Sequence, residues 1–187
     1  MEGMYVKKKI IVFVTFLLIL TTLEVKANIA SKFLAVPNVK QEQSLWCWSA
    51  SGVSILGYKG KNISQSSYAR AVKGSTANQS ATDREVRSGL LNWGVSSTQS
   101  TSAISFTEVV NQVNNNRPIY AGLSWYSSGN RTGGHAVVIR GYVTESGTNY
   151  VSYMDPANGT RYSMAYNDFR GGTSKSRHWD GTLYNVR

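Results

Sequence analysis

The sequence of 187 residues contains a single cysteine, three prolines and only two histidines. One cysteine cannot form a disulfide within the chain, so no internal disulfide framework supports the fold. Cys47 and two widely spaced histidines show no recognisable metal-ligand spacing, and we expect neither a metal nor another cofactor. An unpaired thiol in an exported protein instead suggests a reactive role or pairing with another molecule.

Acidic residues are also scarce. The chain has 10 Asp and Glu against 20 Lys and Arg, which gives a formal net charge of +10. The basic residues are scattered, with no Lys/Arg-rich helix and no zinc-finger spacing, so the sequence does not favour a nucleic-acid partner. A diffuse positive charge attracts anionic cell surfaces or acidic substrates over a long range. We therefore expect affinity for an anionic cell surface.

Only one long apolar run is present, at residues 10–23, and it follows lysines at 7–9. The run is shorter than the roughly 20 residues that a membrane-spanning helix needs. A positive start, a short apolar middle and then a small residue, Ala27, are typical of a secretory signal peptide. We predict that residues 1–27 are removed and that residues 28–187 form one secreted domain without stable membrane insertion. An uncleaved membrane anchor is the alternative.

Helical patterns precede strand patterns along the chain. The predicted helices are Ser44–Gly57, Ser64–Val72, Thr82–Trp93 and Phe106–Val113, and the predicted strands are Ile119–Trp125, His135–Val143 and Tyr150–Met154. Ser44, Ser64 and Thr82 are expected to cap helices, and Glu85 completes a capping-box pattern with Thr82. Helices followed by an antiparallel sheet are typical of the α+β class.

Cys47 lies in the sequence QEQSLWCWSA, within the first turn of the first predicted helix. A helix N-terminus favours negative charge through its free N–H groups and its dipole. A neighbouring imidazolium further favours the thiolate, which is the nucleophilic form of cysteine. The alternative is that Cys47 is an ordinary small core residue. A histidine brought close by folding would decide for the nucleophile.

The two histidines lie in different surroundings. His135 follows Gly133 and Gly134, which we expect to let the backbone bend and to leave room for another chain. His135 also begins a buried strand that would aim its ring. His178 lies in the polar sequence SKSRHWDG and is expected to be a surface residue. We therefore assign the catalytic imidazole to His135.

A carboxylate that would orient this imidazole follows a later strand. Asp155 ends the predicted strand Tyr150–Met154 and precedes Pro156. If this strand pairs antiparallel with the one that begins at His135, the two ends are adjacent, and Asp155 would accept the imidazole N–H. The alternative is an ordinary Asp-Pro turn. The paired-strand geometry favours the orienting role.

Acyl transfer also requires donors for a developing oxyanion. The backbone N–H of Cys47 is one candidate, and the side-chain amide of Gln41 or Gln43 is the second. Spacing alone does not choose between the two glutamines. Trp48 is expected to pack in the core. The residues that we expect to contact the substrate are Trp46, Trp125 and Gly134.

Taken together, these residues resemble bacterial papain-like cysteine proteases, most closely the avirulence-effector type secreted by plant pathogens. The matching segments are Val36-Pro37, Gln41, Trp46-Cys47-Trp48-Ser49-Ala50, Arg117-Pro118-Ile119, Gly134-His135-Ala136-Val137-Val138-Ile139-Arg140-Gly141-Tyr142 and Asp155-Pro156. The resemblance implies a papain-like α+β fold in which the nucleophile helix packs on a C-terminal antiparallel sheet. It also implies a catalytic triad of Cys47, His135 and Asp155, and it selects Gln41 as the oxyanion glutamine.

The chain departs from plant and animal papains in ways that the effector branch shares. Trp46 replaces a small residue, Asp155 replaces an asparagine, and the tryptophan that follows this asparagine is missing. The resemblance implies hydrolysis of a protein or peptide substrate through a thioester acyl-enzyme. Two alternatives stay open. One is a cell-wall peptide amidase or transglutaminase on the same scaffold, and the other is a non-catalytic secreted surface-binding protein.

Overall fold

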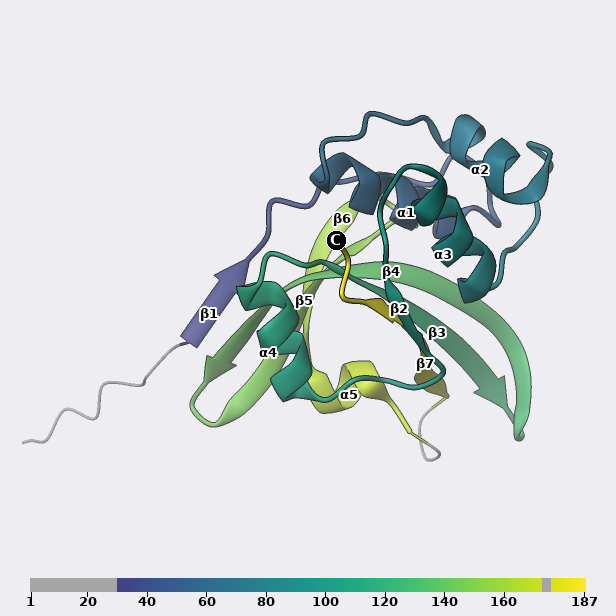
Figure 1. Cartoon of the computed structure of the whole chain (residues 1–187). Helices are drawn as coiled ribbons and strands as arrows, with labels where there is room; N and C mark the ends of the chain where they lie inside the picture. The colour runs from purple at the N-terminus through teal and green to yellow at the C-terminus, as the bar shows by residue number, and fades with distance from the viewer. Residues whose placement is uncertain (1–29, 173–175) are drawn as a thin grey trace, which may run out of the picture.

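Helices α1, α2 and α3 gather on one side of a curved antiparallel sheet, and α5 lies on the other side (Figure 1). The computed structural model describes residues 30–172 and 176–187. The predicted signal peptide, residues 1–27, lies outside these ranges. Within them, no helix is both long enough and apolar enough to cross a membrane.

The secondary structure follows the predicted order of helices and then strands. The helices are α1 (Cys47–Tyr58), α2 (Gln65–Lys73), α3 (Asp83–Asn92), α4 (Phe106–Asn114) and α5 (Tyr166–Arg170). The strands are β1 (Ala30–Phe33), β2 (Thr98–Ser100), β3 (Ile119–Ser127), β4 (Asn130–Glu145), β5 (Thr148–Asp155), β6 (Thr160–Ala165) and β7 (Arg177–Tyr184). The sheet order is β2-β7-β3-β4-β5-β6, with β1 paired to β4 beside this path.

Local capping chemistry sets two of the helix starts as predicted. The Ser64 hydroxyl accepts the backbone N–H of Ser67 at the start of α2. Thr82 and Glu85 form the reciprocal capping box of α3. The expected cap of α1 is wrong, because α1 begins at Cys47 with no side-chain cap. The Ser44 hydroxyl instead accepts a hydrogen bond from Asn78 at 2.8 Å.

The central strand β4 is longer than predicted. It begins at Asn130, directly after the two-residue turn 128–129, whose residues have φ values of 50° and 79° as the tight turn of a twisted hairpin requires. Gly133 and Gly134 are therefore strand residues that pair with β3. The predicted bend before His135 is wrong, and His135 lies within the strand rather than at its start.

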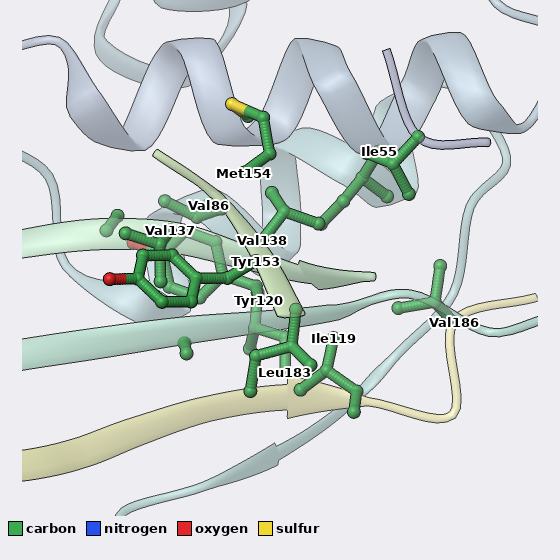
Figure 2. Close-up of a cluster of buried hydrophobic side chains, with 14 of the residues drawn as sticks. Ile55, Val86, Ile119, Tyr120, Val137, Val138, Tyr153, Met154, Leu183 and Val186 are labelled. Carbon is green, nitrogen blue, oxygen red and sulfur yellow. The ribbon is translucent and has the colours of Figure 1, made fainter. Parts of the chain in front are cut away.

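Both faces of β4 are buried, which fixes the strand firmly. Val137, Val138 and Ile139 are all fully buried, and successive side chains of a strand point to opposite faces. Helix α1 covers one face and α4 covers part of the other. Figure 2 shows this packing, with Ile55 of α1 close to the apolar side chains of the sheet. Each such side chain contributes about 1.5–3 kcal/mol by leaving water.

Tyr68 of α2 packs between α1 and α3 and so joins the three helices on this side of the sheet. Its ring is fully buried and its hydroxyl donates to the Val86 carbonyl at 2.8 Å. Two helical glycines leave room for the ring, because a Cβ at Gly52 would lie 2.5 Å from it and a Cβ at Gly89 would lie 2.9 Å from it. The ring also contacts Trp48, one residue from Cys47. The space between Gly52 of α1 and Gly89 of α3, which we call the slot, is filled by the Tyr68 ring. The position of α1 therefore depends on this packing.

We predict that Gly52→Ala lowers the free energy of unfolding by about 1–3 kcal/mol, because the added methyl group overpacks against Tyr68. Glycine to alanine in a helix interior ordinarily stabilises by about 0.5–1 kcal/mol. Urea denaturation measures the change. Gly57→Ala in the same helix is the control, since its Cβ would meet only Pro37, at 3.1 Å, and we expect a smaller loss. A Gly52→Ala protein that is more stable than wild type would contradict the tight packing of Tyr68 against Gly52.

Candidate active site

Helix α1 presents Cys47 to strand β4. Cys47 is the first residue of α1 and its free thiol is partly exposed. Ser51, four residues later, lies on the same side of the helix, and its hydroxyl donates to the Ala136 carbonyl of β4 at 3.2 Å. The residue before Ala136 is His135, which lines the same cleft as Cys47 and is close enough for the thiol to raise the pKa of its imidazole. The fold thus brings the single thiol to one of the two histidines.

The other side of the His135 ring contacts Asp155. Nε2–H donates to Oδ1 of Asp155 at 2.6 Å, and the two side chains are 14% and 23% exposed. Asp155 ends β5, which pairs antiparallel with β4, and its Oδ1 also accepts the backbone N–H of Ala157 at 2.9 Å. Since Nε2 is used by the carboxylate, Nδ1 is the ring nitrogen that remains for Cys47.

The electrostatics of this triplet favour a charged imidazole. Burial opposes the charged form of His135, but the hydrogen bonds to Asp155 and Cys47 and the negative charges of both partners outweigh it and raise its pKa to about 9. Burial likewise acts to raise the pKa of Asp155. The hydrogen bonds from His135 and Ala157 prevail and hold it below its usual value. At neutral pH the arrangement therefore stabilises an imidazolium at His135 beside the Asp155 carboxylate.

Trp125 of β3 packs beside the same imidazole. Its ring centroid lies 5.9 Å from that of His135, with an angle of 45° between the planes. The indole is half-buried, and it sits opposite Gly133 in the strand pairing. A large apolar surface next to His135 limits the ways in which its ring can turn.

The side chain of Gln41 is engaged within the loop before α1. Its amide Nε2 donates to the carbonyls of Gln43 and Ser44, both at 2.8 Å. The backbone N–H of Gln41 donates to the Pro156 carbonyl at 2.8 Å, which ties this loop to the residue after Asp155. The Gln43 amide donates to the Thr76 carbonyl at 3.1 Å. An oxyanion at Cys47 would have to displace one of the two carbonyls from Gln41.

The two tryptophans beside Cys47 are core residues. Trp46 is 1% exposed and Trp48 is 2% exposed. Their indole N–H groups donate to the carbonyls of Ala77 at 3.1 Å and Gln79 at 2.9 Å. The burial of Trp48 is confirmed. The predicted contact of Trp46 with a substrate is wrong, because almost none of its surface is accessible to another molecule.

A cleft of about 810 Å³ begins at the Cys47 and His135 side chains. One wall continues from the loop before α3, and the other consists of β3, β4 and β7. Gly134 lines the cleft, and the space above it is used by Arg131 of the same chain, since a Cβ there would lie 2.5 Å from Nη2.

The far end of the cleft carries a polar network that the sequence did not predict. Ser124 donates to Asp180 at 3.0 Å and accepts from Arg131 at 2.9 Å. Burial raises the pKa of Asp83, and the nearby charge of Asp180 raises it further, against opposing effects of Tyr120 and Arg131. These side chains come from α3, β3, β4 and β7, so no local sequence pattern unites them.

His178 takes no part in the triplet. It lies on β7, pairs with Ser124 in the sheet, and packs its ring 4.8 Å from that of Tyr126. The expectation that His178 is a simple surface residue is wrong, because it is a half-buried strand residue. The flanking polar residues hid the strand, whose apolar positions come later, at Trp179 and Leu183.

Comparison with known protein families gives one match. The family model described as papain-like cysteine protease AvrRpt2 matches residues 30–173. No curated protein sequence matches the chain significantly.

Solved structures show where this fold occurs. A putative C39-like peptidase from Bacillus anthracis has a TM-score of 0.61 at 13% identity, covering 84% of this chain and 98% of that one. Procathepsin L 3 of the Tenebrio molitor larval midgut has a TM-score of 0.57 at 11% identity, covering 83% and 69%. The peptidase domain of Streptococcus ComA has a TM-score of 0.54 at 17% identity, covering 81% and 97%. The predicted papain-like α+β fold is confirmed.

Proposed function

Because the chain belongs to the family of papain-like cysteine protease AvrRpt2 and is a cysteine-type peptidase, we propose that Cys47, His135 and Asp155 are its catalytic triad. The triad hydrolyses peptide bonds of a protein or peptide substrate through a thioester intermediate. The observation that carries this proposal is the single imidazole held between the only thiol and a carboxylate. These are the nucleophile, the base and the orienting group that acyl transfer needs.

The proposed reaction begins with a Cys47 thiolate beside the His135 imidazolium. The sulfur attacks the carbonyl carbon of the substrate, a C–S bond forms, and the carbonyl oxygen becomes an oxyanion. When the C–N bond breaks, the His135 imidazolium gives its proton to the leaving amine. A water molecule then attacks the thioester, with the neutral imidazole accepting its proton, and the thiolate leaves. Asp155 holds the ring in the required orientation throughout.

The oxyanion is proposed to bind the backbone N–H of Cys47 and the side-chain amide of Gln41. The first N–H groups of a helix have no acceptor within that helix, which supports the first donor. For the second donor, one of the Gln41 bonds to the carbonyls of Gln43 and Ser44 gives way to the substrate. The tie between the Gln41 backbone and Pro156 keeps this amide close to the triad.

Substrate contacts are proposed on both sides of the triad. Gly134 lines the cleft beside His135. Trp125 keeps its proposed substrate contact because its half-buried ring lies beside the imidazole, 5.9 Å between centroids. Residues 1–27 hold four lysines and two glutamates, so the secreted domain keeps a formal charge of +8 out of the +10 of the whole chain. This charge supports a further proposal, namely that the enzyme gathers at anionic cell surfaces, where its substrates would be concentrated.

Secretion is part of the proposal. It is supported by the lysines at 7–9, the apolar residues 10–23 and the small residue Ala27. The full chain is expressed in a bacterial host with a general secretory pathway. The extracellular protein is expected to have the intact mass of residues 28–187, with Asn28 as its first residue. A full-length chain that stays in the membrane fraction would contradict this proposal.

We predict that the protein from residue 28 onward cleaves members of a peptide library and that Cys47→Ala and His135→Gln abolish all cleavage while the folded far-UV spectrum is kept. His178→Gln is the matched control. It changes the other histidine of the chain, which the proposed triad does not include, and its cleavage rate is expected to stay within about twofold of wild type. Chromatography of the digests measures all four proteins.

The same proteins, assayed on other substrates, separate the alternatives. Release of amino-sugar peptides from purified peptidoglycan, with casein and the library left intact, would favour the cell-wall amidase. Joining of glutamine side chains to amines would favour a transglutaminase. Failure of the folded wild-type protein on all of these substrates would contradict an enzymatic role of Cys47 and favour a surface-binding protein.

A further inference from the structure

A set of hydrogen bonds joins residues 43–48, around Cys47, to the loop 75–79 between α2 and α3. We call this set of hydrogen bonds the strap. The backbone N–H of Leu45 donates to Asn78 Oδ1 at 2.9 Å, and Asn78 in turn donates to Ser44 at 2.8 Å. The indole N–H groups of Trp46 and Trp48 donate to the carbonyls of Ala77 and Gln79. The Gln43 amide adds a bond to the Thr76 carbonyl.

The loop that receives these bonds forms neither helix nor strand. Its position therefore depends on the groups that bind its carbonyls rather than on a backbone ladder. The next residues along the chain, 80–82, line the same cleft as Cys47 and His135. The strap thus ends where the substrate-facing wall begins.

The two tryptophans are the buried part of the strap. They flank Cys47 in sequence, at the residue before α1 and at its second position. A buried indole N–H needs an acceptor, and the two acceptors here are two residues apart on the same loop. Tyr68 packs against Trp48, so the slot that fixes α1 also fixes this indole.

We propose that Trp46 and Trp48 are positioning residues that hold the cleft wall 80–82 at a set distance from the Cys47 sulfur. This inference rests on the proposed peptidase function for its catalytic consequence, but not for its structural one. Each indole has one N–H group, and in both residues it donates to a carbonyl of the loop rather than to Cys47 or His135. The indoles act through the loop, so their loss should change how a substrate lies along the cleft and leave the Cys47–His135 pair intact.

The first test asks whether the indole N–H groups hold the loop. Trp46→Phe and Trp48→Phe keep an apolar ring and remove the donor, and both are made in a Cys47→Ala background so that the chain's own activity plays no part. Cleavage by elastase after the exposed residue Ala77 is expected to be about fivefold faster, as the loss of one hydrogen bond allows.

Trp93→Phe is the matched control for this test. Trp93 packs against Tyr68 as Trp48 does, at 5.5 Å, but within the described part of the chain it donates no bond to the loop. Asn78→Ala is a second test variant, because it loosens the same loop from an exposed position without touching the core. Unchanged elastase cleavage in both tryptophan variants and in Asn78→Ala would overturn the proposal.

The second test uses the active enzyme and separates substrate positioning from nucleophile chemistry. With a peptide substrate, the two tryptophan variants are expected to raise KM about fivefold while kcat stays within about twofold. Alkylation of Cys47 by iodoacetamide, which is too small to contact the wall, is expected to keep the wild-type rate. If alkylation and peptide cleavage fall together, the tryptophans serve the nucleophile and the proposal is wrong. Failure of the proposed function would appear differently, as wild-type protein that does not cleave at all.

Discussion

The whole site depends on one contact, in which the imidazole of His135 bridges helix α1 and strand β5. Cys47 approaches the ring from the helix and Asp155 holds it from the strand. This contact joins residues 88 positions apart in the sequence, so its geometry is only as fixed as the packing of α1 on the sheet. The buried faces of β4, the Ser51 bond to Ala136 and the filled slot around Tyr68 provide that rigidity. A catalytic constellation requires such preorganisation.

Much of this arrangement can be predicted because its causes are local. Capping chemistry at Ser64 and Thr82 sets helix starts within a few residues of sequence. The approach of Asp155 to His135 follows from one hairpin, because the antiparallel pairing of Met154 with Val138 brings the end of β5 to the part of β4 that carries His135. The start of α1 could not be predicted in this way. The Ser44 hydroxyl is bound by Asn78, which lies 34 residues away, and a distant partner leaves no local signal.

The errors at the site have the same physical origin. Trp46 is a large apolar residue of the kind that often lines a substrate pocket. Only the position of loop 75–79 shows that its indole is buried instead. Asp83 and Asp180 meet across α3 and β7, because Gly181 leaves space that a Cβ would occupy within 1.9 Å of the Asp83 carboxylate. Residue types therefore indicate the chemistry of the triad, whereas the shape of the cleft is set by long-range packing.

Titration of the His135 imidazole by nuclear magnetic resonance tests the central contact most directly. The chain has two histidines, and a His178→Gln variant assigns the signals. The pKa of His135 is predicted to be about 9 in the wild-type protein and lower in Cys47→Ala, which lacks the hydrogen bond and charge of the sulfur. A pKa near the ordinary value of about 6.5, unchanged by Cys47→Ala, would contradict the account, because the thiol and the imidazole would then not interact.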